Sequence, residues 1–183
     1  MAEQSVDPTL TERDRCLVDL VTGLPRKILR YHNVDGLAQM VLHELGHDGG
    51  FGFDRATYLI DNPDFDHLRG VAGYSKQECQ YHKDNIWDDP NCFCKDMEQA
   101  EFHNNVRSIL NNSFKRNDIN LNDADDVREL GSELGMNEPS FFSWDMKHGN
   151  HGLFIYEKDD KICLWRHGLL KNISAMLSMC GIR

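Results

Sequence analysis

The sequence has no long apolar run and no pronounced basic stretch. No apolar segment approaches the roughly eighteen residues that a membrane-spanning helix needs. Residues 1–11 lack the basic, apolar and small-residue order of a secretion signal. Acidic residues outnumber basic ones, 30 to 20, and the net charge of −10 repels phosphate backbones. We therefore expect a soluble protein with no membrane or nucleic-acid partner.

Several catalytic signatures are also missing. The chain contains no Gly-x-Ser-x-Gly elbow, no phosphate loop of the Gly-x4-Gly-Lys-Ser/Thr type and no Gly-x-Gly-x2-Gly dinucleotide turn. The six cysteines come without a secretory context, so we expect reduced thiols and a cytoplasmic location. The sequence therefore gives no support to a serine hydrolase, a nucleotide triphosphatase or a disulfide-stabilised secreted domain.

The length of 183 residues predicts a single domain over 1–183. Apolar periodicity and turn residues predict an α+β fold, mostly helical, with a short β-sheet. A strand is expected at 56–60, before an Asn-Pro turn. Helices are expected in 9–29 with a break near Pro25, in 37–47, from a capping box at Ser75, in 96–114 and in 123–134.

The C-terminal part, 140–183, is predicted as a possible subdomain. Residues 151–157 and 161–166 have the composition of strands and flank Lys158-Asp159-Asp160, which indicates a β-hairpin. An amphipathic helix is expected over 169–179.

The segment His43-Glu44-Leu45-Gly46-His47 is the most specific chemical pattern. Two histidines four residues apart lie on one face of a helix, where both imidazoles can bind one metal ion. Glu44 would lie beside them and could take a proton from a metal-bound water. The pattern indicates a metal-binding protein and a possible zinc-dependent hydrolase.

The stretch from Val41 to His47 resembles the active-site helix of zincin-type metallopeptidases. The resemblance implies that His43 and His47 are zinc ligands, that Glu44 is the catalytic base and that a third ligand comes from elsewhere. It also implies a peptide or other small-molecule substrate. Iron held by two histidines and a carboxylate is an alternative metal.

The third ligand has several candidates. His67 is favoured over Asp54, and Cys79 and His82 could also complete the site. A second zinc group is possible as well, because thiolate and imidazole ligands suit zinc. Its candidates are Cys79, His82, Cys92, Cys94 and His103.

The alternative class is a non-enzymatic protein in which the motif is incidental. Phe141, Phe142 and Trp144 precede the expected hairpin, and His148, His151 and His167 lie near its ends. A sheet with an aromatic face is typical of a small binding or sensor module, and the acidic surface would then select a protein partner. Such a protein would bind no metal and have no activity.

Overall fold

A computed structural model describes residues 11–78, 85–113, 124–158 and 162–180 of the chain. In this part a five-stranded antiparallel sheet has the order β3-β2-β1-β5-β4. Its strands are β1 (Arg55–Asn62), β2 (His67–Ser75), β3 (Leu110–Asn111), β4 (Ser140–Asp145) and β5 (His151–Glu157). The helices are α1 (Glu12–Arg30), α2 (Leu37–Gly46), α3 (Pro90–Met97), α4 (Glu101–Arg107), α5 (Ala124–Glu133) and α6 (Leu164–Ser174), with a 3-10 helix, Ala175–Met179, after α6.

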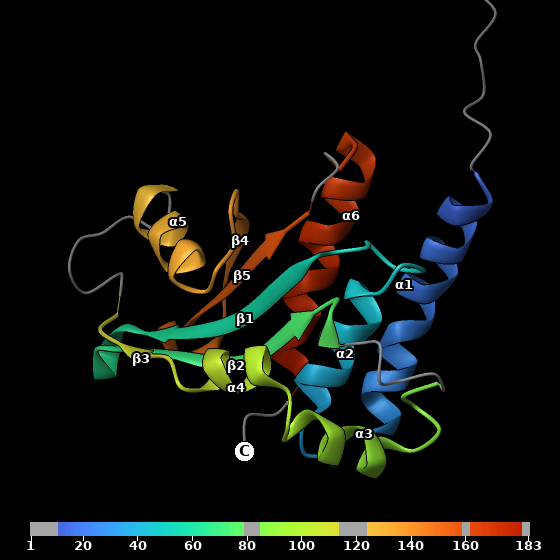
Figure 1. The fold of residues 1–183 in the computed structure, drawn as a ribbon, viewed down its shortest axis with the longest axis horizontal. Coiled ribbons are helices and arrows are strands. Elements are labelled where there is room, and N and C mark those ends of the chain that lie inside the picture. The colour runs from blue at the N-terminus through green and yellow to red at the C-terminus, as the bar shows by residue number, and fades with distance from the viewer. Residues whose placement is uncertain (1–10, 79–84, 114–123, 159–161, 181–183) are drawn as a thin grey trace, which may run out of the picture.

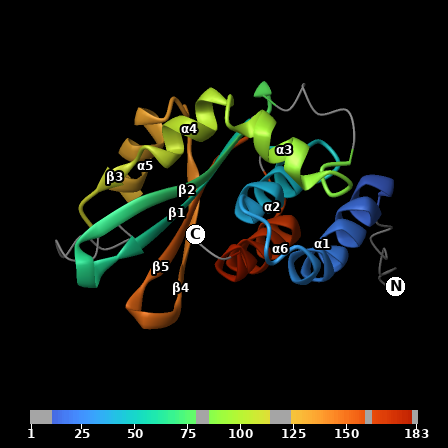
Figure 2. The same ribbon diagram turned by 90° about the horizontal axis from the view of Figure 1, so that it is seen from below.

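The helices cover both faces of the sheet (Figures 1 and 2). Helices α1, α2 and α6 pack on one face around a core that includes Leu24, Leu42 and Leu170. Helices α4 and α5 pack on the other face around Val106 and Leu130. The predicted α+β class is therefore confirmed, as three layers with the sheet in the middle.

Strand β5 shows how the sequence builds these layers. Leu153 and Ile155 belong to the core beneath α4 and α5, whereas Phe154 and Tyr156 belong to the core beneath α1, α2 and α6. Successive side chains on a strand point to opposite faces, so a continuous apolar run is what a sheet covered on both sides requires.

Helix α1 begins at a capping box. The Asp14 backbone N–H donates to the Thr11 hydroxyl, and the Thr11 backbone N–H donates to the Asp14 carboxylate. The break expected near Pro25 is wrong, since α1 continues to Arg30. A proline inside a helix removes one backbone hydrogen bond. Leu24 before Pro25 and Ile28 after it are both fully buried, and their packing on the core holds this part of the helix in place.

The C-terminal hairpin is built from other strands than the expected ones. Strand β5 pairs with β4, which precedes it, and Leu164, Trp165 and Arg166, expected in the second strand, begin helix α6. The helix expected over 169–179 is confirmed, since α6 and the 3-10 helix after it extend to Met179. This helix buries Leu170 and Ile173 in the core.

Ser75 ends strand β2. Most of the helix expected after it falls on residues 79–84, which lie outside the described residues, so that expectation stays a prediction. The single helix expected over 96–114 is divided into α3 and α4, because Ala100 has extended backbone angles, φ −73° and ψ 111°, at the start of α4. The strand expected at 56–60 is confirmed as β1, followed by the turn at Pro63. No described helix is long and apolar enough to cross a membrane.

Strand β2 has two features that shape the site. Its register with β1 shifts between Tyr58 and Leu59, which leaves Val71 as the extra residue of a β-bulge. Its other edge pairs with β3 only at Leu68 and Arg69. Beyond Arg69 the outer edge of β2 is therefore open to side chains from the neighbouring helices.

Candidate functional site

Helix α2 ends before the second histidine of the motif. His47 follows it with extended backbone angles, φ −66° and ψ 170°, so the expectation that both histidines lie on the helix is wrong. The carbonyls of Leu45 and Gly46 accept the N–H groups of Phe51 and Phe53, and this turn closes the helix. The exposed His47 ring accepts the Gly49 N–H at Nδ1, 2.9 Å away.

His43 is buried in an aromatic setting. Its ring lies edge-on to the rings of Tyr74 and Phe93, with a centroid separation of 5.0 Å in each case. Only 4% of the residue is exposed. His43 thus packs α2 against β2 and α3, as a core histidine does.

Glu44 joins α1, α2 and the segment before α3. Its carboxylate accepts from Lys27 Nζ at 2.5 Å and from Trp87 Nε1 at 2.7 Å. The Lys27 ammonium also lies 5.2 Å from the centroid of the Trp87 ring. Both carboxylate oxygens therefore have partners within the protein, and the contacts are those of a structural ion pair.

The other proposed ligands are dispersed. His67 begins β2, is exposed and pairs with Asn62 across the hairpin. Asp54 precedes β1, where its N–H donates to the Glu157 carbonyl and its carbonyl accepts from Lys76. The described residues contain no group of three His, Cys, Asp or Glu side chains able to hold a metal ion. Cys79 and His82 lie outside the described residues, so a site completed by either of them stays a prediction.

The described members of the second zinc group have separate environments. Cys92 is exposed on α3, and the Cys94 thiol lies 3.0 Å from the Asp35 carbonyl. Burial raises the pKa of the Cys94 thiol, which favours the neutral form over a metal-binding thiolate. His103 lies on α4, where it is 6% exposed. Near the hairpin, the His151 ring contacts the Asp145 carboxylate and His167 lies against Phe142.

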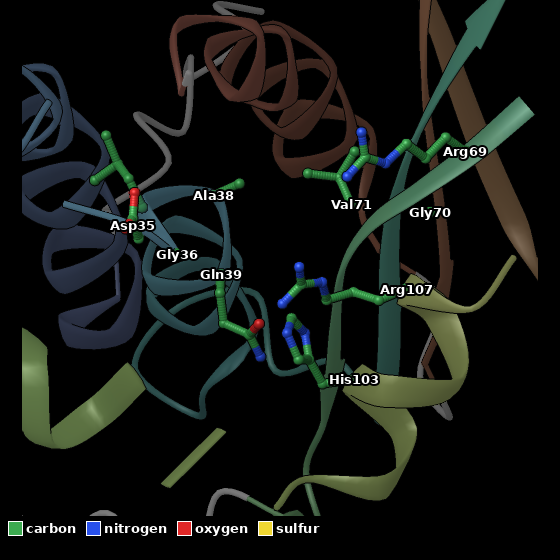
Figure 3. Close-up of a pocket in the computed structure, with 10 residues that line it drawn as sticks. Asp35, Gly36, Ala38, Gln39, Arg69, Gly70, Val71, His103 and Arg107 are labelled. Atoms are coloured by element: carbon green, nitrogen blue, oxygen red, sulfur yellow. The ribbon is translucent and has the colours of Figure 1, made fainter. Parts of the chain in front are cut away.

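A cavity opens where α2, β2 and α4 meet, and we call it the α2–β2–α4 cavity (Figure 3). Its volume is about 370 Å³, within the range typical of small-molecule sites. The residues that line it are Asp35, Gly36, Leu37, Ala38, Gln39, Arg69, Gly70, Val71, His103 and Arg107.

Gln39 and His103 occupy the open edge of β2 from opposite faces of the sheet. The Gln39 side-chain amide donates to the Gly73 carbonyl at 3.0 Å, and the Gly73 N–H donates to His103 Nδ1 at 3.2 Å. The two side chains thus satisfy the Gly73 carbonyl and N–H, which would pair with a neighbouring strand if β3 extended this far.

The Gln39 amide is left with one unsatisfied atom. Its nitrogen donates to the Gly73 carbonyl and also contacts Met97 Sδ at 3.0 Å, and these contacts orient the amide. Its oxygen is buried and has no hydrogen-bond partner among the described residues. A buried acceptor without a donor costs about 1–3 kcal/mol. Gln39 therefore presents an acceptor at a cavity wall (Figure 3).

His103 is neutral near pH 7. Burial, and secondly the positive charge of Arg107, lower its pKa from 6.5 to about 4. Because Nδ1 accepts the Gly73 N–H, the proton of the neutral ring is on Nε2. The Nδ1 atom of His103 therefore accepts from β2, and the Nε2–H group remains as a donor.

Two arginines line the cavity. Arg69 comes from β2, and Arg107 lies one helical turn after His103 on α4. Figure 3 shows both guanidinium groups extending from the β2 and α4 side toward α2. Neither makes an ion pair with a carboxylate of the described residues.

The bulge at Val71 explains the direction of Arg69. Arg69 pairs with Ile60 and Ala72 pairs with Tyr58, and these partners belong to the core on the α2 face. Residues three apart in a regular strand point to opposite faces. The extra residue therefore puts both Arg69 and Ala72 on the side of α2.

A second cavity, of about 240 Å³, adjoins the first. The two share Asp35, Gly36, Gln39, His103 and Arg107. The second cavity adds Phe93, Cys94, Met97, Glu98 and Asn104 from α3, α4 and their connection. Because they share these residues, the two cavities lie side by side, and we refer to them together as the groove.

The sequence singles out His103 for a different role and does not indicate Gln39, Arg69 or Arg107. Only the spacing of His103 and Arg107 could have indicated this site from the sequence, because residues four apart share a helix face. Nothing local indicates Arg69, whose direction depends on the bulge.

No protein-family model and no curated protein matches this sequence. Among solved structures, the chain is similar to that of SdiA in complex with octanoyl-rac-glycerol. The similarity has a TM-score of 0.39 and 16% sequence identity, and it covers 88% of this chain and 66% of that chain. Similarity at this level supports no inference about ligand or activity.

Proposed function

We propose that this domain is a binding module that takes a small molecule into the α2–β2–α4 cavity. The observation that carries the proposal is the buried Gln39 oxygen, which has no donor among the described residues and lies at the cavity wall. A ligand with an N–H or O–H group there would satisfy it and recover the cost of its burial.

The surroundings of the cavity support the same proposal. Its walls come from both faces of the sheet and from its open edge, so a bound molecule would contact α2, β2 and α4 together. Its polar groups converge on a small volume while Leu37, Ala38 and Val71 supply apolar contacts, which is typical of small-molecule sites.

The zinc-dependent hydrolase predicted from the sequence is less well supported by the described geometry. Glu44 is held by Lys27 and Trp87, and His47 lies beyond the end of α2. The described residues do not fit the zincin ligand set, and we derive no catalytic step from it. Metal binding completed by Cys79 or His82 stays a prediction.

Fragment screening by saturation-transfer NMR tests the proposed function. The protein should bind fragments that carry a hydrogen-bond donor. Val71→Trp, which fills the cavity without changing charge, should abolish most of these hits, as should Gln39→Leu. Val18→Trp, on the exposed face of α1, is the matched control and should retain them. Equal hit sets in the cavity variants and the control, with circular dichroism showing that all are folded, would refute the proposed site.

A further inference from the structure

Two arginines line the α2–β2–α4 cavity of this acidic protein. The chain carries a net charge of −10, yet Arg69 and Arg107 extend toward the same space without a carboxylate partner among the described residues. Asp35 also lines the cavity, but Figure 3 places it on the opposite side of α2 from the two guanidinium groups. An anion at the arginines would gain their attraction without meeting that carboxylate directly.

The N-terminus of α2 faces the same cavity. Gly36 is its N-cap in the left-handed conformation, φ 82°, and no described side chain caps the helix. The N–H groups of the first turn have no acceptor within the helix, and the helix dipole is positive at this end. The Leu37 N–H donates to the Val34 carbonyl at 3.4 Å, so the donors available to a bound oxyanion are the N–H groups of Ala38 and Gln39, two residues that line the cavity.

Gln39 is the independent observation that points to a ligand here. It stands in the same first turn of α2, it is 2% exposed, and its side-chain oxygen has no donor among the described residues. A ligand with a hydrogen-bond donor a short distance from its anionic group would satisfy this oxygen as well.

We propose that the cavity binds an organic phosphate monoester, with the phosphoryl group between Arg69, Arg107 and the first turn of α2. This inference rests on the proposed function and names its ligand class. A phosphoryl group presents three acceptor oxygens and about two negative charges, which match two guanidinium groups and a helix N-terminus better than a carboxylate does.

The adjoining cavity receives the organic part of the ligand. Phe93 and Met97 provide an apolar wall, and Gln39 and His103 are shared by both cavities. A ring or chain of modest size would lie against Phe93 while its donor reaches the Gln39 oxygen. Inorganic phosphate fills only the first part of this groove, so an ester should bind more tightly.

Isothermal titration with inorganic phosphate, phenyl phosphate and benzoate tests the inference, and the variants are Arg69→Gln and Arg107→Gln. We expect phenyl phosphate to bind most tightly and benzoate at least tenfold more weakly. Each arginine variant should weaken phenyl phosphate by about tenfold or more, the usual effect of losing a charge-assisted hydrogen bond. Arg26→Gln, on the exposed side of α1, is the matched control and should leave binding unchanged.

The outcomes separate this inference from the proposed function. If benzoate equals phenyl phosphate, or if Arg26→Gln has the same effect as the cavity variants, the phosphate assignment is overturned. If donor fragments bind and are lost in Val71→Trp while no phosphate binds, the binding module stands and only its ligand class is wrong. If neither fragments nor phosphates bind, both proposals fail.

Discussion

Gln39 holds the open edge of strand β2 by donating its side-chain amide to the Gly73 carbonyl over 3.0 Å. The same side chain leaves its oxygen buried without a donor among the described residues. One residue thus links the packing of α2 on the sheet to an unsatisfied acceptor in a cavity.

Gln39→Leu should separate stability from binding. Leucine removes the donor to Gly73, which destabilises the fold, and it also removes the buried unsatisfied oxygen, which stabilises it. We expect a net change in the free energy of unfolding within about 1 kcal/mol, since the two effects oppose each other. Urea denaturation measures this change. A loss of several kcal/mol would mean that the Gln39 oxygen has a stabilising partner.

Glu44→Gln tests the ion pair against the catalytic role implied by the zincin resemblance. The variant loses the charge attraction to Lys27 while keeping an oxygen that can accept from Trp87. We expect a loss of about 1 kcal/mol in unfolding free energy, and about 2–3 kcal/mol for Glu44→Ala, which leaves the indole N–H unpaired. Glu133→Gln, at an exposed position on α5, should be neutral.

Metal analysis completes that test. If Glu44 is a catalytic base, Glu44→Gln should keep both its stability and its zinc content and lose only turnover. If Glu44 is structural, as its contacts indicate, stability should fall and the metal content should not change. A stable, zinc-loaded and inactive variant would contradict the structural role.

The stability of the domain should depend on pH through His103. Its folded pKa, about 4, lies below the ordinary histidine value of 6.5, so between these values the unfolded chain binds a proton that the folded chain does not. The free energy of unfolding therefore rises with pH across this window, by up to about 1.4 kcal/mol per pH unit from this group, and levels off above it.

His103→Gln removes this contribution. The slope of unfolding free energy against pH should become shallower between pH 4 and 6.5 than in the unmodified protein, and the two slopes should agree above about pH 7. Chemical denaturation at a series of pH values gives both curves. Parallel curves through the whole window would show that His103 titrates normally.

Gly70 marks the close contact between β2 and α4. A Cβ atom at this position would overlap the Val106 carbonyl oxygen, which is helix backbone and cannot rotate away. Gly70→Ala should therefore displace α4 and cost about 3 kcal/mol or more. Gly168→Ala is the matched control in α6, where a Cβ meets nothing within 4 Å, and it should stabilise the helix by up to about 1 kcal/mol. Thermal denaturation compares the two, and a similar melting temperature for both would contradict the packing at Gly70.

Local patterns in the sequence predict the elements whose own composition favours one structure. The apolar residues of α2 and the apolar and β-branched run at 56–60 in β1 are of this kind. The helix expected over 169–179 is confirmed, but the strand expected over 161–166 is wrong at Leu164, Trp165 and Arg166, which begin α6. The helix prediction fails at His47 because the turn that ends α2 depends on the N–H groups of Phe51 and Phe53, further along the chain.

The α2–β2–α4 cavity could not be predicted from the sequence because it depends on contacts between distant segments. Gln39, Arg69 and Arg107 belong to three elements, and none of them stands out in its own segment. They converge because a β-bulge redirects Arg69 and because the short β3 leaves the edge of β2 open. Neither the bulge nor the strand order leaves a local mark in the sequence.

The most direct test of the binding-module proposal is a titration of isotopically labelled protein with phenyl phosphate and the donor fragments, observed by nitrogen-proton correlation NMR. We expect the backbone amides of Ala38 and Gln39 and the side-chain amide of Gln39 to shift first and furthest. Arg69 and Arg107 should follow, with α1 and α6 unaffected. Shifts confined to other surfaces, or saturating shifts that persist unchanged in Val71→Trp, would contradict a ligand site between α2, β2 and α4.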